Sequence, residues 1–204
     1  MKSNGKFFKK NNKGFSLVEL SIVLIIVSFI VFAVVSAKSL IINSRLLDLS
    51  STVKKINMAQ TSFINAYKQV PGDANITSFG AEYSKGNNDG FVGEGSVLDV
   101  ESILFFTHLH KAGFLEEVYE KTTAPDSIEE ITKDYYPETK FKNVFIGVVG
   151  SSFNNLYIRS TRFIFFSNSK TTHNFTPKIA EKYNKKFDDG STSNGKIISI
   201  NTEL

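Results

Sequence analysis

The sequence has no cysteine and no tryptophan, and only four prolines among its 204 residues. Without cysteine there is no disulfide-stapled fold, and no thiolate can act as nucleophile or metal ligand. The sequence also has no Gly-x-Ser-x-Gly, no phosphate loop, no dinucleotide fingerprint and no Ser/His/Asp set with recognisable spacing. Adjacent acids such as Glu116-Glu117 and Glu129-Glu130 stand in polar segments, which is typical of a solvated surface. We therefore expect no catalytic residues and no enzymatic activity.

The positive charge of the chain is concentrated at its N-terminus. The formal net charge is +4, and five lysines without an acid precede Gly14: Lys2, Lys6, Lys9, Lys10 and Lys13. Removing residues 1–14 would lower the net charge from +4 to −1. The remaining chain is therefore not basic, which argues against non-specific binding of nucleic acid. A lysine-rich segment before an apolar run favours a cytoplasmic N-terminus.

One long apolar run follows these lysines. Residues 20–37 are 18 consecutive uncharged residues, which as a helix span about 27 Å, close to the hydrocarbon thickness of a bilayer. Glu19 stands at the edge of this run. A carboxylate costs about 3 kcal/mol near the bilayer centre, and such residues usually mark a function. The rest of the chain is long enough for one modest globular domain.

The run KKNNKGFSLVELSIVLIIV resembles the prepilin leader and N-terminal helix of type IV pilins and type II secretion pseudopilins. In that family a membrane peptidase cuts after the glycine and methylates the new N-terminal residue. The resemblance implies cleavage between Gly14 and Phe15, N-methylation of Phe15, and Glu19 as the fifth mature residue. An ordinary secretory signal is cut after its apolar region at small residues, a pattern that residues 36–38 imitate only faintly. A plain single-span anchor is the alternative.

Cleavage would give Glu19 a partner. It would leave a cationic amine on Phe15, and a charge in an apolar setting needs a counter-charge. Phe15 and Glu19 are four residues apart, on one face of a helix, so they could pair within a subunit. The resemblance implies that Glu19 of an incoming subunit meets the Phe15 amine of a subunit already in the fibre. A glutamate that reaches water without a partner is the alternative.

The apolar run is predicted to continue as one long helix. No proline or glycine occurs in residues 15–70, and Pro71-Gly72 makes a stop. The helix, from residue 15 to about residue 69, would be roughly 80 Å long. The amphipathic seam of its second half comprises Leu46, Leu49, Val53, Ile56, Gln60, Phe63, Tyr67 and Val70. We divide the chain into a cleaved leader (1–14), a membrane and assembly half (15–40), an amphipathic half (41–70) and a globular α+β domain (71–204).

The globular part mixes helices with strands. A helix over residues 99–112 is capped by Asp99 and stopped by Gly113, and a helix over residues 176–187 has Thr176 as its cap and Pro177 first. Residues rich in Phe, Val and Ile predict strands at 141–149, 153–160, 162–167 and 196–201, with turns at 150–152 and 160–161. With the resemblance, these elements imply an α+β pilin-like fold in which an antiparallel sheet packs on the long helix.

Residues 71–98 are rich in Asp, Asn and Gly, which suit tight turns. An EF-hand fails here, because Lys85 and Ser96 stand where acids are needed. An irregular calcium site involving Asp73, Asp89, Asp188 or Asp189 is the alternative to plain turn chemistry, and we expect no other cofactor. His108 and His110 lack the i, i+4 spacing of zinc helices. The PGD turn, the Asn/Asp-Gly loop and the sequence HLHKAGFL resemble pilin-like proteins with a prepilin-type cleavage/methylation N-terminus.

Together these features predict a structural subunit of a type II secretion pseudopilus or a type IV pilus. Its expected partners are the prepilin peptidase, other pilin or pseudopilin subunits, an inner-membrane assembly platform and membrane lipid. It would cross the bacterial inner membrane once, with a cytoplasmic N-terminus and a periplasmic domain, before entering the fibre. The alternative is a minor pilin that binds DNA or a surface ligand. Segments 71–98 and 116–140 are the expected specificity surfaces.

Overall fold

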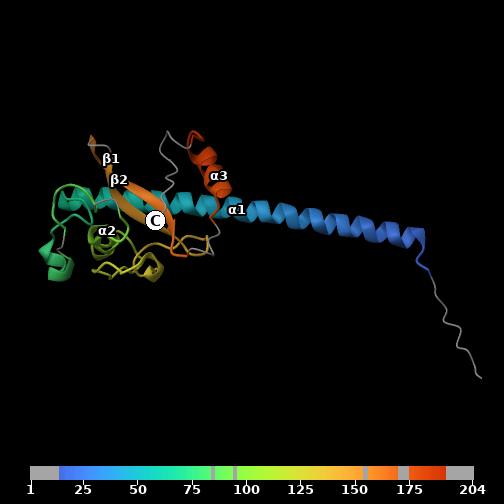
Figure 1. The fold of residues 1–204 in the computed structure, drawn as a ribbon, viewed down its shortest axis with the longest axis horizontal. Coiled ribbons are helices and arrows are strands. Elements are labelled where there is room, and N and C mark those ends of the chain that lie inside the picture. The colour runs from blue at the N-terminus through green and yellow to red at the C-terminus, as the bar shows by residue number, and fades with distance from the viewer. Residues whose placement is uncertain (1–13, 84–85, 94–95, 154–155, 170–174, 192–204) are drawn as a thin grey trace, which may run out of the picture. The chain divides into compact units, whose positions relative to one another are not determined.

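The computed structural model describes residues 14–83, 86–93, 96–153, 156–169 and 175–191 (Figure 1). Its elements in chain order are α1 (Leu17–Tyr67), the short 3-10 helices η1 (Thr77–Phe79) and η2 (Ala81–Tyr83), α2 (Val100–Lys111), η3 (Ile128–Glu130), β1 (Val144–Phe153), β2 (Leu156–Ser167) and α3 (Pro177–Phe187). The chain forms two compact units, Met1–Asn43 and Ser44–Leu204, and α1 contributes residues to both.

In the first unit α1 presents apolar side chains on all sides. The exposed fractions of its large apolar side chains between Leu17 and Ile41 run from 48% at Val27 to 87% at Leu17. An 18-residue window of this helix has a mean hydropathy of 3.0, and none of it is buried by the protein. A helix that is apolar all round needs an apolar environment. By length and composition it fits a membrane-spanning helix, as the sequence predicts.

In the second unit α1 is amphipathic and one of its faces enters the core. Leu46, Leu49, Ile56 and Phe63 from the predicted seam are buried, and Ala59 joins them. The other four seam positions, residues 53, 60, 67 and 70, are half-buried. The helix ends at Tyr67, two residues before the predicted end, because Lys68 already adopts a left-handed backbone with φ of 58°.

Helix α2 lies in the core of this unit, with every residue from Glu101 to Leu109 buried. The Asp99 side chain caps it by accepting a hydrogen bond from the Glu101 N–H, as predicted. The C-cap is Ala112, and Gly113 takes the left-handed conformation with φ of 75°. The rings of Phe63 in α1 and His108 in α2 are stacked with centroids 6.0 Å apart.

Strands β1 and β2 form an antiparallel pair in which Val144 lies opposite Ser167 and Gly150 opposite Thr161. The predicted turns at 150–152 and 160–161 are wrong, because both segments lie inside strands and the chain reverses between Phe153 and Leu156. Gly150 instead permits a close approach: its N–H donates to the Val92 carbonyl, and an added Cβ would lie 2.8 Å from that oxygen. The register shifts between Gly150 and Ser152, which is where the extra residue of a bulge lies.

Helix α3 has the predicted bounds and Pro177 in its first turn, but the Thr176 side chain makes no capping hydrogen bond. Its Tyr183 is buried against Phe165 of β2, with centroids 5.6 Å apart, and hydrogen-bonds the Ser50 side chain of α1. The predicted strand at residues 196–201 lies outside the described residues. A long N-terminal helix and a small antiparallel sheet make an α+β fold that is consistent with a pilin-like architecture.

Candidate processing and assembly site

The junction predicted for cleavage lies immediately before α1. Gly14, Phe15 and Ser16 precede the helix, and the Phe15 side chain is 85% exposed. A Cβ added to Gly14 would meet no atom within 4 Å. Gly14 and Phe15 are therefore accessible to another molecule, and a larger residue at position 14 would meet no atom of the described residues.

Ser16 and Glu19 form a capping box at the start of α1. The Glu19 Oε2 accepts a hydrogen bond of 2.9 Å from the Ser16 N–H, and the Ser16 Oγ accepts one of 3.3 Å from the Val18 N–H. Each side chain thus satisfies a backbone donor that the first helical turn leaves without a partner. The negative charge of Glu19 also lies where the helix dipole favours it. The carboxylate is held one turn from the Gly14–Phe15 bond.

Ser16 is a residue of this site that the sequence reasoning missed. Its signal is present in the sequence, because Ser-x-x-Glu before an apolar run is the pattern of a capping box. Phe15 lies outside the helix, and its nitrogen is a peptide nitrogen in the uncut chain. The pairing of a Phe15 amine with Glu19 stays a prediction for the cut chain.

The residues proposed for calcium lie in three segments: Asp73 in the turn after α1, Asp89 in the loop of residues 86–93, and Asp188 and Asp189 after α3. Asp73 is buried, and its two carboxylate oxygens accept hydrogen bonds from the Asp89 and Gly90 N–H groups at 3.0 and 2.8 Å. Asp188 and Asp189 lie in the turn after α3, where Asp189 accepts from the Ser191 N–H. Among the residues that the structure describes, no group of three or more His, Asp or Glu side chains is placed to hold a metal ion.

Glu101, like Asp73, accepts hydrogen bonds from backbone N–H groups in the loop of residues 86–93. It is buried in the first turn of α2 and accepts hydrogen bonds from the Asn87 and Gly93 N–H groups at 3.0 and 2.9 Å. Burial raises the pKa of both carboxyl groups above the ordinary range, and the backbone donors only partly offset this. The two acids fasten the 86–93 loop to the turn after α1 and to α2.

His108 is a structural residue of the α2 core. Its Nδ1 accepts a 2.9 Å hydrogen bond from the Gly72 N–H, so the proton of the neutral ring lies on Nε2, 2.6 Å from the Tyr83 carbonyl oxygen. Burial lowers the pKa of this imidazole. His108 thus joins α2 to the turn after α1 and to η2.

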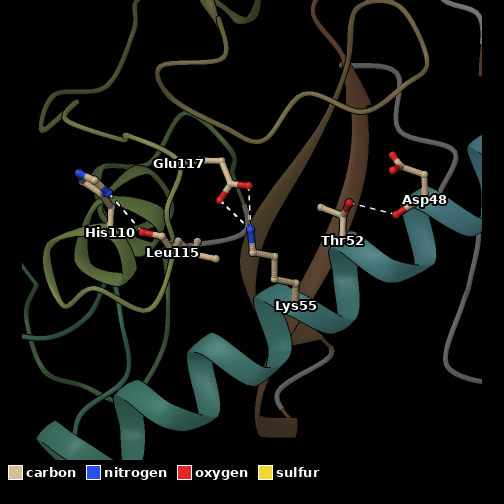
Figure 2. A network of polar contacts seen from close by, with 6 residues as sticks. All are labelled: Asp48, Thr52, Lys55, His110, Leu115 and Glu117. Carbon is tan, nitrogen blue, oxygen red and sulfur yellow. Dashed lines mark hydrogen bonds and ion pairs between the residues drawn. The ribbon is translucent and has the colours of Figure 1, made fainter.

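Helix α1 and the segment after α2 are joined by an ion pair (Figure 2). The Lys55 Nζ lies 2.9 and 3.1 Å from the two Glu117 carboxylate oxygens, and both side chains are about half exposed. The lysine lowers the pKa of Glu117. Nearby, His110 contacts the Leu115 carbonyl at 3.4 Å.

Comparison with known proteins identifies the N-terminal segment. Residues 9–35 match the family model described as the prokaryotic N-terminal methylation motif. No curated protein and no solved structure matches the chain. The matched segment contains the Gly14–Phe15 junction, the Ser16–Glu19 capping box and the start of the apolar helix. The chain therefore carries the prepilin-type cleavage motif that is characteristic of type IV pilins and pseudopilins.

Proposed function

We propose that this chain is a structural subunit that is cut by prepilin peptidase between Gly14 and Phe15 and assembled into a pseudopilus or pilus. The observation that carries the proposal is the methylation motif at residues 9–35, placed directly on an exposed junction and a helix apolar enough to cross a membrane. The motif supports an anchored pilin-like subunit, and the machine that it serves is part of the proposal.

Before cutting, the subunit would rest in the inner membrane with its lysine-rich leader in the cytoplasm and residues 44–204 in the periplasm. The five leader lysines favour this orientation. The exposed apolar side chains of α1 support the same location, because lipid would cover them. The backbone N–H and C=O groups of a helix are hydrogen-bonded to one another and so need no water in the membrane.

After cutting, Glu19 would gain a cationic amine as a partner. The capping box already fixes the carboxylate at the first turn, where the helix favours negative charge. In a fibre of parallel helices the amine of one subunit and the carboxylate of its neighbour would neutralise each other away from water. Glu19 would then select the axial offset between neighbouring subunits, because an offset that separates the two charges leaves both unpaired.

The test of processing is the mass of the membrane-extracted protein in cells with an active prepilin peptidase. We expect Gly14→Val to keep residues 1–14, although position 14 has free space in the fold. Gly5→Val is the matched control within the leader and should be cut like the parent chain. Cleavage of Gly14→Val at the same bond would contradict the assigned junction.

The test of assembly compares Glu19→Ala with Glu19→Gln. Both should be cut, both should stay in the membrane fraction, and both should be depleted from sheared fibres, since neither can neutralise an amine. Glutamine keeps an oxygen that can accept the Ser16 N–H, so it separates helix capping from charge. Normal fibre entry by Glu19→Gln would show that the charge is not needed.

The binding-module alternative predicts aromatic faces beside lysines, as nucleic-acid binders use. Helix α3 has the lysines, but Tyr183 on its inner face is 5% exposed and packs on Phe165. Tyr183 is therefore a core residue, whereas the half-buried Phe187 ring, whose centroid lies 5.6 Å from the Lys186 Nζ, is the α3 aromatic that the alternative could use. Loss of DNA uptake with intact fibres on removing the α3 lysines would favour the alternative.

A further inference from the structure

The charges of the mature chain are separated along the sequence. Residues 71–138 contain fourteen acids and four lysines, a net charge of −10. Residues 140–186 contain nine lysines and arginines and one acid, a net charge of +8. The small overall charge therefore results from two strongly charged segments of opposite sign.

The basic segment ends in a stripe of lysines on α3. Lys178, Lys182 and Lys186 follow one another at intervals of four residues and so lie on one face of the helix. Lys178 and Lys186 are exposed and Lys182 is half-buried. The acid of this helix, Glu181, is in an ion pair with Lys185. We call Lys178, Lys182 and Lys186 the lysine stripe.

The acidic segment contains an exposed run after α2, in residues 116–134. Its acids are all exposed: Glu116, Glu117, Glu120, Asp126, Glu129, Glu130 and Asp134. Two lysines lie among them, and Lys121 is placed over the Tyr135 ring, 5.2 Å from its centroid. Val118, between Glu117 and Tyr119, is an exposed apolar side chain at 59%. We call residues 116–134 the acidic segment.

The two surfaces are fixed to different sides of α1. Tyr183 of α3 hydrogen-bonds Ser50, and Glu117 of the acidic segment pairs with Lys55. Five residues at about 100° each place these two attachment points roughly 140° apart around the helix. Neither the Lys55–Glu117 pair nor the Lys185–Glu181 pair joins the lysine stripe to the acidic segment.

We propose that the lysine stripe of one copy contacts the acidic segment of a second copy of this chain in the assembled fibre. This inference rests on the proposed function, because it needs parallel copies side by side. A contact between two different surfaces of identical chains is heterologous, and repeated contacts of that kind build open helical filaments. Opposite charges on the two surfaces set the register and disfavour stripe-to-stripe contacts. Exposed charges act over about 8 Å at physiological salt, so the contact should weaken as salt is raised.

The absence of cysteine permits a direct test by crosslinking in cells. The full chain would carry Lys182→Cys together with Glu120→Cys and be treated with a short bifunctional thiol reagent. The sheared-fibre fraction should then show a ladder of dimers, trimers and longer products. Each single variant has one thiol per chain, so it should give no product beyond a dimer.

The fibre fraction distinguishes failure of this inference from failure of the proposed function. Fibres that contain the double variant but give no ladder would overturn the contact and leave the fibre role intact. Absence of the chain from every fibre, for the parent and the variants alike, would overturn the proposed function itself.

A charge-reversal pair supplies an independent readout. Changing the lysine stripe to glutamate (K178E, K182E and K186E) should reduce the fibre fraction at least about tenfold, because like charges would then face each other. Co-expression with a chain carrying E116K, E120K and D126K should recover fibres that contain both chains. Lys54→Glu, an exposed reversal on α1, is the control for non-specific charge effects. Full assembly by the reversed stripe would contradict the inference.

Discussion

His108 offers the sharpest test of how the globular unit is held together. Its two ring nitrogens have opposite roles, since Nδ1 accepts from the Gly72 N–H and Nε2 contacts the Tyr83 carbonyl. A protonated ring would place a second donor against the Gly72 N–H. The fold therefore needs the neutral imidazole, in agreement with the lowered pKa that burial gives it.

The loss of unfolding free energy on replacing His108 follows from the backbone groups that would be left without a hydrogen-bond partner. His108→Leu fills a similar volume but removes both polar contacts. Each buried backbone group without a partner costs roughly 1–3 kcal/mol. We expect a loss of about 2–4 kcal/mol in the free energy of unfolding at pH 7.5, since Tyr83 is half-buried and its carbonyl can partly recover a bond to water.

The direction in which the stability contributed by His108 changes with pH follows from the difference between its folded and unfolded pKa. The folded pKa of His108 lies below the ordinary value of 6.5, so its contribution is present above pH 6.5 and is lost as the pH falls below 6.5 toward the folded pKa. The difference in unfolding free energy between the parent and His108→Leu should shrink there by up to about 1.4 kcal/mol per pH unit. The raised pKa values of the buried acids act in the opposite direction at lower pH, and they cancel in this difference.

The assay is chemical unfolding of the full chain in detergent between pH 5 and pH 8, followed by circular dichroism. His110→Gln is the matched control, since His110 makes one long contact of 3.4 Å and its replacement should cost less unfolding free energy than that of His108. A difference between the parent and His108→Leu that does not change with pH would refute the assigned tautomer and its partners.

The remaining predictions concern the core, the loop, the ion pair and calcium. Phe63→Ala should lower the unfolding free energy by about 3–5 kcal/mol, because it removes a fully buried ring; a loss below 1 kcal/mol in denaturant titration would contradict the described core. Glu101→Gln should cost about 1–3 kcal/mol and speed amide exchange at Asn87 and Gly93, since the amide nitrogen cannot accept; unchanged exchange would argue against this anchor. Lys55→Ala should cost at most about 1 kcal/mol, and 1 M salt should remove the effect, which a salt titration of both chains would check. Calcium at 1 mM should leave the midpoint of thermal unfolding unchanged, because the Asp73 oxygens already accept backbone bonds; a rise that EDTA reverses would restore the calcium hypothesis.

The elements that local patterns control could be predicted from the sequence. The Asp99 cap and the glycine at 113 fixed the bounds of α2, and Pro177 fixed the start of α3. The uninterrupted run before Pro71-Gly72 gave the long helix to within two residues at each end. In each case the deciding residues lie within one helical turn of the boundary.

Features that depend on distant partners could not be predicted in this way. Gly150 had the signature of a turn, but the structure uses it to let the Val92 carbonyl approach β1. The loops that contain Asp73 and Asp89 had the composition of a calcium site, but in the structure Asp73 and Glu101 accept hydrogen bonds from backbone N–H groups 8 to 17 residues away. At the junction the capping role of Ser16 was missed, and the roles of Gly14, Phe15 and Glu19 in cleavage, methylation and assembly stay predictions.

The proposed function requires that the leader is removed at one defined bond, between Gly14 and Phe15. Mass spectrometry of the N-terminal peptide, from protein extracted from membranes with an active prepilin peptidase, measures where the chain is cut. We expect a peptide that begins at Phe15 and is heavier by one methyl group on its amine. A peptide that still carries the lysines of residues 2–13 would contradict it.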